Sequence, residues 1–211
     1  MSVSDLETCT YAYEGKLDDL TQFLTQKPEF LNKRDSNERA PIHWACSSGN
    51  TDIVKMLLGK DAEINEKDDS GWTPLMIASS AGHIDIADIL IKNKCEVNES
   101  NHTGLTALHY AVSKDNINIT KMLIASDADI NARDKYGNTT LHRAVSIEKT
   151  AMVELLIEAG VGLDIQDTRG NTALHIACEI MNQGLIQLLI ASGADKEVKN
   201  KEGKTAVQLL H

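Results

Sequence analysis

Four histidines, at positions 43, 109, 142 and 175, are the residues with the clearest potential for chemistry. Neutral imidazole is the commonest metal ligand in proteins and a frequent general base, so recurring histidines could form a metal or catalytic site. They follow one period, because every separation among them is a multiple of 33 residues. Whether they can act together depends on how the elements that carry them are arranged.

The histidines belong to a six-residue motif that recurs along the chain. It reads Thr-Pro-Leu-Met-Ile-Ala at 73–78 and Thr-Ala-Leu-His-Tyr-Ala at 106–111. Its third residue stands at 42, 75, 108, 141, 174 and 207, a constant step of 33. This period and signature resemble those of the ankyrin repeat. The resemblance implies an all-α solenoid of about seven helix-turn-helix repeats with hairpin-like finger loops.

Local signals agree with this pattern. Thr73 is a good N-cap residue, and Pro74 suits the first position of a helix. Apolar residues at i, i+3 and i+4 give the second helix of each repeat a broad buried face. Each repeat closes with a turn such as Asp134–Gly137, which has Asp first and Gly fourth. We expect left-handed residues after the second helices, at Gly160, Gly193, Asp61, Lys94 and Asp127.

We expect a single domain over residues 1–211. Its approximate repeats are 3–34, 37–69, 70–102, 103–135, 136–168 and 169–201, followed by an incomplete repeat at 202–211. The first repeat lacks the motif but keeps its phase, since Ala12 lies 33 residues before Ala45. A terminal repeat needs a polar outer face. The candidates for that face are Asp5, Glu7, Thr8, Asp18, Asp19, Thr21 and Gln22.

The repeat arrangement argues against a metal or catalytic site. Stacked repeats place equivalent histidines about 10 Å apart, whereas metal ligands lie about 2 Å from the ion. In ankyrin repeats this histidine ties neighbouring loops, so the resemblance implies a structural role. Acidic pairs such as Asp68-Asp69 are expected in solvent, and no phosphate loop or nucleophile motif is present. We therefore expect neither enzymatic activity nor a metal or other cofactor.

The cysteines and the charge balance limit the environment and the partners. Cys9, Cys46, Cys95 and Cys178 have no C-x-x-C spacing and indicate small buried residues in a reducing compartment. The formal net charge of −10 argues against binding nucleic acid or an anionic membrane. The first residues lack the pattern of a signal peptide, so we expect the protein in the cytoplasm and nucleus. We also expect a monomer.

Aromatic residues outside the needs of the repeat indicate a binding surface. Trp44 and Tyr110 share one phase, immediately before the motif alanine, and they either pack between helices or anchor a partner. Arg143 occupies the same position of its repeat, and its charged guanidinium must contact water or an acidic group. Trp72, beside a turn glycine, is the better anchor, because aromatic residues and arginine dominate interface energies. Charged residues surround these positions: Glu38, Arg39, Asp68, Asp69, Lys114 and Lys149.

Several stretches outside the repeat consensus are similar to the gankyrin family of proteasome-assembly chaperones, among them Ala12–Leu17, His43–Ser47 and Lys67–Trp72. The resemblance implies binding of the C-terminal helical domain of one proteasomal regulatory-particle ATPase on the concave face. The contact positions of that family that match here are Arg39, Trp44, Asp68, Asp69, Trp72, Tyr110, Lys114 and Arg143. The alternative is a signalling adaptor or inhibitor that binds a cyclin-dependent kinase or a transcription factor through the same face.

Overall fold

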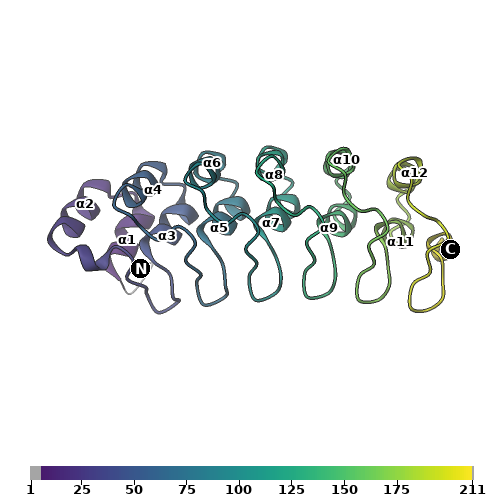
Figure 1. The fold of residues 1–211 in the computed structure, drawn as a ribbon, viewed down its shortest axis with the longest axis horizontal. Coiled ribbons are helices and arrows are strands. Elements are labelled where there is room, and N and C mark those ends of the chain that lie inside the picture. Colours follow the sequence, from purple (N-terminus) through teal and green to yellow (C-terminus); the bar gives the residue numbers. More distant parts are fainter. Residues whose placement is uncertain (1–5, 211) are drawn as a thin grey trace. The chain divides into compact units, whose positions relative to one another are not determined.

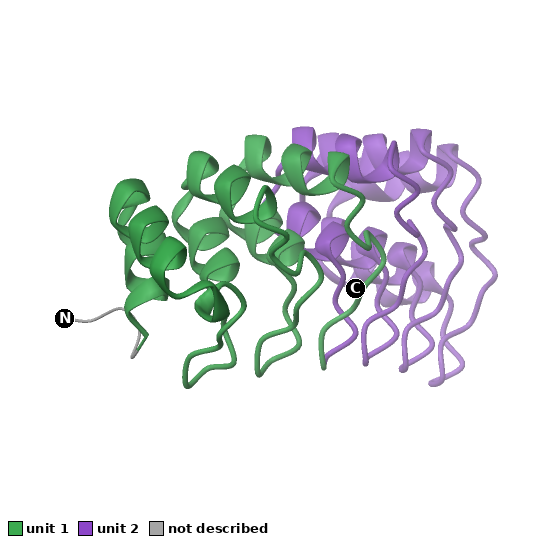
Figure 2. Ribbon diagram, turned by 60° about the vertical axis from the view of Figure 1, so that its left-hand side comes forward, with its two compact units in different colours: residues 1–102 green, residues 103–211 purple. Residues whose placement is uncertain are grey.

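The computed structural model describes residues 6–210 and divides the chain into two compact units, residues 1–102 and 103–211 (Figure 2). The boundary coincides with the predicted end of the third repeat. A single domain over the whole chain stays a prediction. The expected start of the first repeat at residue 3 lies outside the described residues, as do Asp5 and His211.

The first unit consists of three helix pairs (Figure 1). The first helices of its repeats, α1, α3 and α5, pack against one another in one row, and α2, α4 and α6 form a second row. A short 3-10 helix follows α2. The elements are α1 (Glu7–Glu14), α2 (Leu17–Gln26), η1 (Pro28–Phe30), α3 (Pro41–Ser48), α4 (Thr51–Leu58), α5 (Pro74–Ala81) and α6 (Ile84–Lys92).

The second unit repeats this arrangement, with α7, α9 and α11 in one row and α8, α10 and α12 in the other (Figure 1). A 3-10 helix of the last, incomplete repeat packs on α11. The elements are α7 (Ala107–Ser113), α8 (Ile117–Ile124), α9 (Thr140–Ser146), α10 (Thr150–Glu158), α11 (Ala173–Glu179), α12 (Gln183–Ala191) and η2 (Ala206–Leu209). No strand occurs in residues 6–210, so the predicted all-α fold class is confirmed.

The predicted helix ends are confirmed. The Thr73 hydroxyl accepts a hydrogen bond from the Met76 N–H at the start of α5, and Gly82 ends that helix in the left-handed region. The five residues expected in that region after second helices all have positive φ: Asp61, Lys94, Asp127, Gly160 and Gly193. Outside glycine this conformation costs about 1 kcal/mol per residue, a strain that the packed repeats hold in place.

The core of each unit lies between the two helix rows. Ile53 and Leu57 of α4 and Leu185 and Leu189 of α12 are buried at i and i+4, as the apolar spacing predicts. The prediction that Thr8 lies on the polar outer face of the first repeat is wrong, because Thr8 is 0% exposed. It lies one turn before the buried Ala12, and α1 packs its buried side against α3.

The four cysteines are free and buried, as expected. Burial raises the pKa of the Cys46 thiol above its usual range and that of Cys95 to about 11. Both thiols are therefore protonated at neutral pH, which makes them poor nucleophiles and poor metal ligands.

The recurring histidines are structural. The Nδ1 atom of His43 accepts the Ala40 N–H at 3.1 Å, and its Nε2 atom donates to the Glu66 carbonyl of the next loop at 3.0 Å. His142 accepts from Thr139 at 3.2 Å and donates to Asn171 at 3.0 Å. His109 and His175 follow the same pattern. Among residues 6–210 no group of three or more His, Cys, Asp or Glu could hold a metal ion.

Burial keeps the imidazoles of His43, His109 and His142 neutral. It lowers the pKa of His43 to about 4, and it holds the pKa values of His109 and His142 below their usual range. The unfolded chain therefore takes up protons near pH 6.5, before the folded chain does. Stability from the His43 tie is complete above pH 6.5 and is lost as the pH falls toward 4.

In the last repeat, a side chain that does not titrate makes the same contact with the start of the helix. The side-chain oxygen of Gln208, in the same phase, accepts the Thr205 N–H at 2.9 Å. We predict that His43→Gln keeps the acceptor and reduces the loss of stability between pH 7 and pH 4. The difference should approach about 3 kcal/mol, the linkage value for a pKa of about 4 in the folded chain against 6.5 in the unfolded chain.

Urea unfolding of both proteins at half-unit pH intervals measures this difference. Parallel pH profiles for the wild type and His43→Gln would show that the pH dependence arises elsewhere.

No helix in residues 6–210 combines the length and the apolar character that are required to cross a membrane.

Candidate functional site

The finger loops that begin at residues 35, 68, 134, 167 and 200 are closed from within by the side chain at their base. The Oδ1 atom of Asp68 accepts the backbone N–H groups of Ser70 at 3.0 Å and Trp72 at 2.8 Å. In the second unit, Oδ1 of Asp134 accepts those of Tyr136 and Asn138, both at 2.9 Å. The same pairs of bonds reach Asp35, Asp167 and Asn200.

The expectation that Asp68 lies in solvent is wrong. Asp68 is 4% exposed, whereas its neighbour Asp69 is exposed as expected. A buried carboxylate is stable only when hydrogen bonds and charge partners replace its hydration. Here the two backbone donors and the guanidinium of Arg39 supply them.

Backbone hydrogen bonds join neighbouring fingers at their tips. In the first unit the Asp69 N–H donates to the Asn37 carbonyl at 3.2 Å. In the second unit Thr168 donates to Tyr136 at 2.8 Å, and Lys201 donates to Arg169 at 2.9 Å. The tips are thus held in register within each unit. Together with the exposed sides of the first helices they form what we call the finger face of each unit (Figure 1).

Three of the predicted contact residues meet on the finger face of the first unit. Arg39 binds Oδ2 of Asp68 through Nε and a terminal nitrogen, both at 3.0 Å. Its guanidinium lies 5.2 Å from the centre of the Trp44 ring. The indole N–H of Trp44 donates to Oδ2 of Asp35 at 2.8 Å. The cluster fixes the orientation of an aromatic and a cationic side chain that are both half-buried.

Trp44 was expected either to pack between helices or to remain available to a partner, and its side chain has features of both. Its ring packs edge-on against Tyr13, with the ring centres 5.7 Å apart, yet it keeps part of its surface in solvent. Trp72 follows the glycine of the next finger and is also half-buried. Asp69 is exposed at the tip of that finger, where the Ser70 hydroxyl donates to it at 3.2 Å.

The second unit contains the other three predicted residues. A terminal nitrogen of Arg143 lies 3.4 Å from Oδ2 of Asp134. Asp134 is thus an acidic partner of the kind that this guanidinium was expected to need. Tyr110 is half-buried on α7, and Lys114 is exposed one turn further along. Arg143 and Trp44 are three repeats apart, and each bonds the finger aspartate nine residues before it.

Asp35 and Asp134 were missed as parts of the site by reasoning from the sequence. They hold Trp44 and Arg143 in place, although Asp134 was interpreted only as a turn residue and Asp35 was not singled out. Their spacing from those anchors recurs, and this recurrence was the available signal. Whether the eight predicted residues contact a partner stays a prediction.

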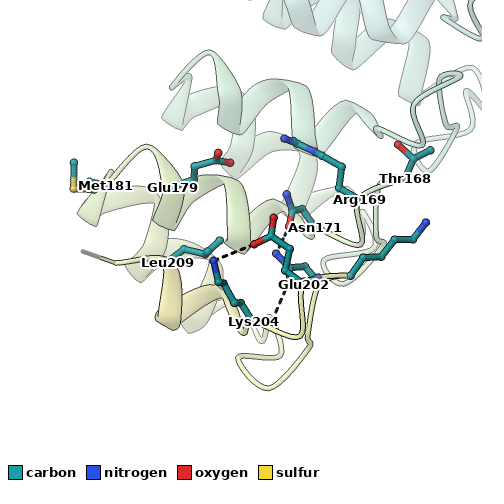
Figure 3. Close-up of a pocket in the computed structure, with 10 residues that line it drawn as sticks. Thr168, Arg169, Asn171, Glu179, Met181, Glu202, Lys204 and Leu209 are labelled. Carbon is teal, nitrogen blue, oxygen red and sulfur yellow. Dashed lines mark hydrogen bonds and ion pairs between the residues drawn. The ribbon is translucent and has the colours of Figure 1, made fainter.

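The second unit also has two hollows on its finger face. A larger one of about 720 Å³ lies among the last two fingers, the end of α11 and η2 (Figure 3). A smaller one of about 370 Å³ lies beside α9 and α11. Arg169 and Glu179 line both.

The adjacent pair Asp68 and Asp69 tests how far the finger face depends on buried carboxylates. We predict that Asp68→Ala lowers the free energy of unfolding by about 2–3 kcal/mol, because two backbone donors and one guanidinium lose their acceptor. Asp69→Ala should change it by less than about 0.5 kcal/mol, as at an ordinary surface site. Urea unfolding measures both, and equal effects would contradict this account of the finger.

Comparisons with known proteins agree with the repeat architecture. The ankyrin domain of Bcl-3, described as a unique member of the IkappaB protein family, superposes with a TM-score of 0.90 at 26% identity, over 98% of this chain and 94% of that one. The human ASB11 ankyrin domain superposes with a TM-score of 0.86 at 26% identity, over 98% and 92%.

A shorter segment of the chain is similar to a regulatory subunit of the proteasome. The rat 26S proteasome non-ATPase regulatory subunit 10 is 42% identical over 52 residues, and the human protein is 40% identical over 52 residues. These segments cover 25% of this chain and only 22% and 23% of those proteins. The family described as "Ankyrin repeats (3 copies)" matches residues 9–101, 93–167 and 141–210. The chain therefore belongs to the ankyrin-repeat family, whose repeats imply a protein-binding role.

Proposed function

We propose that this protein is a non-enzymatic chaperone for assembly of the 26S proteasome regulatory particle. In this role it holds the C-terminal helical domain of one proteasomal ATPase subunit on its finger face. The observation that carries the proposal is the set of aromatic and cationic side chains that finger carboxylates hold at the surface. The similarity to regulatory subunit 10 supports the choice of partner.

Fixed anchors favour binding for a physical reason. A free arginine or tryptophan loses rotamer freedom when a partner immobilises it, at a cost of about 0.5–1.5 kcal/mol per side chain. Arg39 and Trp44 are already oriented by Asp68 and Asp35, so much of this cost is met on folding. The exposed charges of Lys114 and Asp69 would guide the encounter and select the partner.

The proposal assigns no enzymatic activity, and the use of the four recurring histidines and of the buried cysteines supports this. Both ring nitrogens of His43, His109, His142 and His175 are engaged with backbone groups or cap residues, which leaves none for proton transfer. Burial raises the pKa values of the Cys46, Cys95 and Cys178 thiols, which are therefore poor nucleophiles. Buried free thiols suit a reducing compartment, and we propose the cytoplasm and nucleus.

The signalling alternative rests on the shared fold. An adaptor or inhibitor for a cyclin-dependent kinase or a transcription factor would use the same finger face, and the Bcl-3 domain has the same architecture. Mass spectrometry of proteins that co-purify with the tagged chain separates the two functions. Proteasomal ATPases should dominate the captured set if the chaperone function is correct.

Substitutions on the two finger faces test the proposal directly. We predict that Trp72→Ala with Lys114→Glu lowers capture of the proteasomal ATPase at least tenfold, since a desolvated aromatic anchor is worth about 2 kcal/mol or more. Lys114 is preferred to Arg143 here, because Arg143→Glu would place a second carboxylate beside Asp134 and disturb the finger.

Lys121→Glu on the exposed side of α8 is the matched charge control and should leave capture unchanged. Circular dichroism and urea unfolding establish that both variants are folded. If the double variant captures the ATPase as well as the wild type does, the finger face is not the binding site.

A further inference from the structure

We propose that the tip of the finger at residues 134–138 is a further contact with the bound protein, in which Tyr136 enters an apolar recess of the partner. The inference rests on the proposed function, because it assumes that a protein occupies the finger face, and it adds a contact at a finger tip. Tyr136 is not among the predicted contact residues. Its finger lies between α8 and α9, with complete helix pairs of the second unit on both sides.

Tyr136 is the most exposed aromatic side chain of residues 6–210. It is 58% exposed, whereas Tyr13 is 40% exposed and the other aromatic residues in that range are half-buried. Single exposed apolar residues are ordinary on protein surfaces, so exposure alone assigns no role. What distinguishes Tyr136 is the type of residue at the same position of the other fingers.

The equivalent positions of the other fingers hold polar residues, Asn37, Ser70, Thr103, Arg169 and Glu202. At this position the fold uses the backbone carbonyl, which accepts the N–H of the next finger. The Asn37 carbonyl accepts from Asp69 at 3.2 Å, and the Tyr136 carbonyl accepts from Thr168 at 2.8 Å. Every residue type supplies such a carbonyl, so the tyrosine side chain is not required to join the fingers.

The ring has one neighbour on its own finger. The ammonium nitrogen of Lys135 lies 5.0 Å from the centre of the Tyr136 ring. A cation–π contact at an exposed site is weak, and it leaves most of this ring in solvent. The contact orients the ring without burying it, so its apolar surface remains available to a partner.

The backbone of the tip is held on both sides of Tyr136. Its N–H donates to Oδ1 of Asp134 at 2.9 Å, and its carbonyl accepts from the next finger. Gly137 follows with φ of +77°, and a Cβ atom there would lie 3.0 Å from the Thr168 nitrogen. The finger therefore presents Tyr136 from a fixed backbone, and binding has only the side-chain torsions left to immobilise.

The carboxylate of Asp134 connects Tyr136 with a predicted contact residue. Its Oδ1 atom accepts the Tyr136 N–H, and its Oδ2 atom lies 3.4 Å from a terminal nitrogen of Arg143. A standard protein interface involves about 20–30 residues on each side. An interface that includes Arg143 is therefore wide enough to include the tip of the same finger.

The chemistry of tyrosine specifies the kind of surface that it contacts. The ring is apolar over most of its area, whereas the hydroxyl at its end needs water or a polar group. Tyrosine is also enriched among the residues that dominate interface energies when they are desolvated. We therefore expect an apolar recess that takes the ring and leaves the hydroxyl at its rim.

Isothermal titration calorimetry of the full chain with purified C-terminal helical domains of the proteasomal ATPases tests this contact. We expect Tyr136→Ser to weaken binding of the domain that the wild type holds at least fivefold. Tyr136→Phe keeps the ring and should weaken it less than twofold. Asn37→Ser introduces the same residue at the equivalent position of the finger that begins at Asp35 and should bind as the wild type does.

Photo-cross-linking gives a second measurement on the same complex. p-Benzoylphenylalanine in place of Tyr136 should cross-link to the ATPase domain under ultraviolet light. The same replacement of Lys121, on the exposed side of α8, should not. Urea unfolding of Tyr136→Ser should have the midpoint of the wild type, because the backbone bonds of the tip do not change.

The inference is overturned if Tyr136→Ser binds the domain as tightly as the wild type does, if no cross-link forms at position 136, or if Tyr136→Ser lowers the urea midpoint. Equal losses for Tyr136→Ser and Tyr136→Phe would contradict the apolar recess, because the hydroxyl would then make the contact. If the wild type binds none of the ATPase domains, the proposed function fails and this inference fails with it. Intact binding by both the wild type and Tyr136→Ser removes only this contact and leaves the proposed function standing.

Discussion

The buried carboxylate at the base of a finger is the interaction on which the finger face depends. Asp68 and Asp134 each take two backbone N–H groups of their own loop and one side chain of the face. One acidic group thus closes the turn and also orients an anchor. Because an unpaired buried carboxylate is costly, the loop and the anchor are stabilised together. The contacts that close the finger are therefore also the contacts that orient side chains on the finger face.

The repeat motif divides its residues between two tasks. In the stretch around His109 the threonine, leucine, histidine and alanine build the helix start, the core and the loop tie. The residue before the alanine, Tyr110 here and Trp44 or Arg143 elsewhere, lies half-buried at the surface. Structure is therefore maintained by positions that repeat, while recognition can vary at a position that the repeat does not need.

Much of the fold was predictable because its causes are local. Caps such as Thr73, left-handed residues such as Asp61 and the i, i+4 apolar pairs all follow from neighbouring residues in the chain. The misjudged residues were those whose environment comes from another element. Asp68 was expected in solvent and is enclosed by its finger and by Arg39 of the preceding finger loop. Thr8 was expected on a polar face and lies where α1 packs on α3.

The sequence by itself determined the period of 33 and the helix pairs, since each depends on residue type and spacing within a repeat. Its resemblance to the ankyrin repeat implied the structural role of the histidines. It also indicated which side chains depart from the repeat. Only the tertiary structure decided how those side chains are held: Trp44 by Asp35, Arg39 by Asp68, and Arg143 by Asp134. It also decided that Arg169, Lys201 and Met181 border one hollow. Such groupings depend on distances between loops of different repeats, which the order of residues alone does not specify.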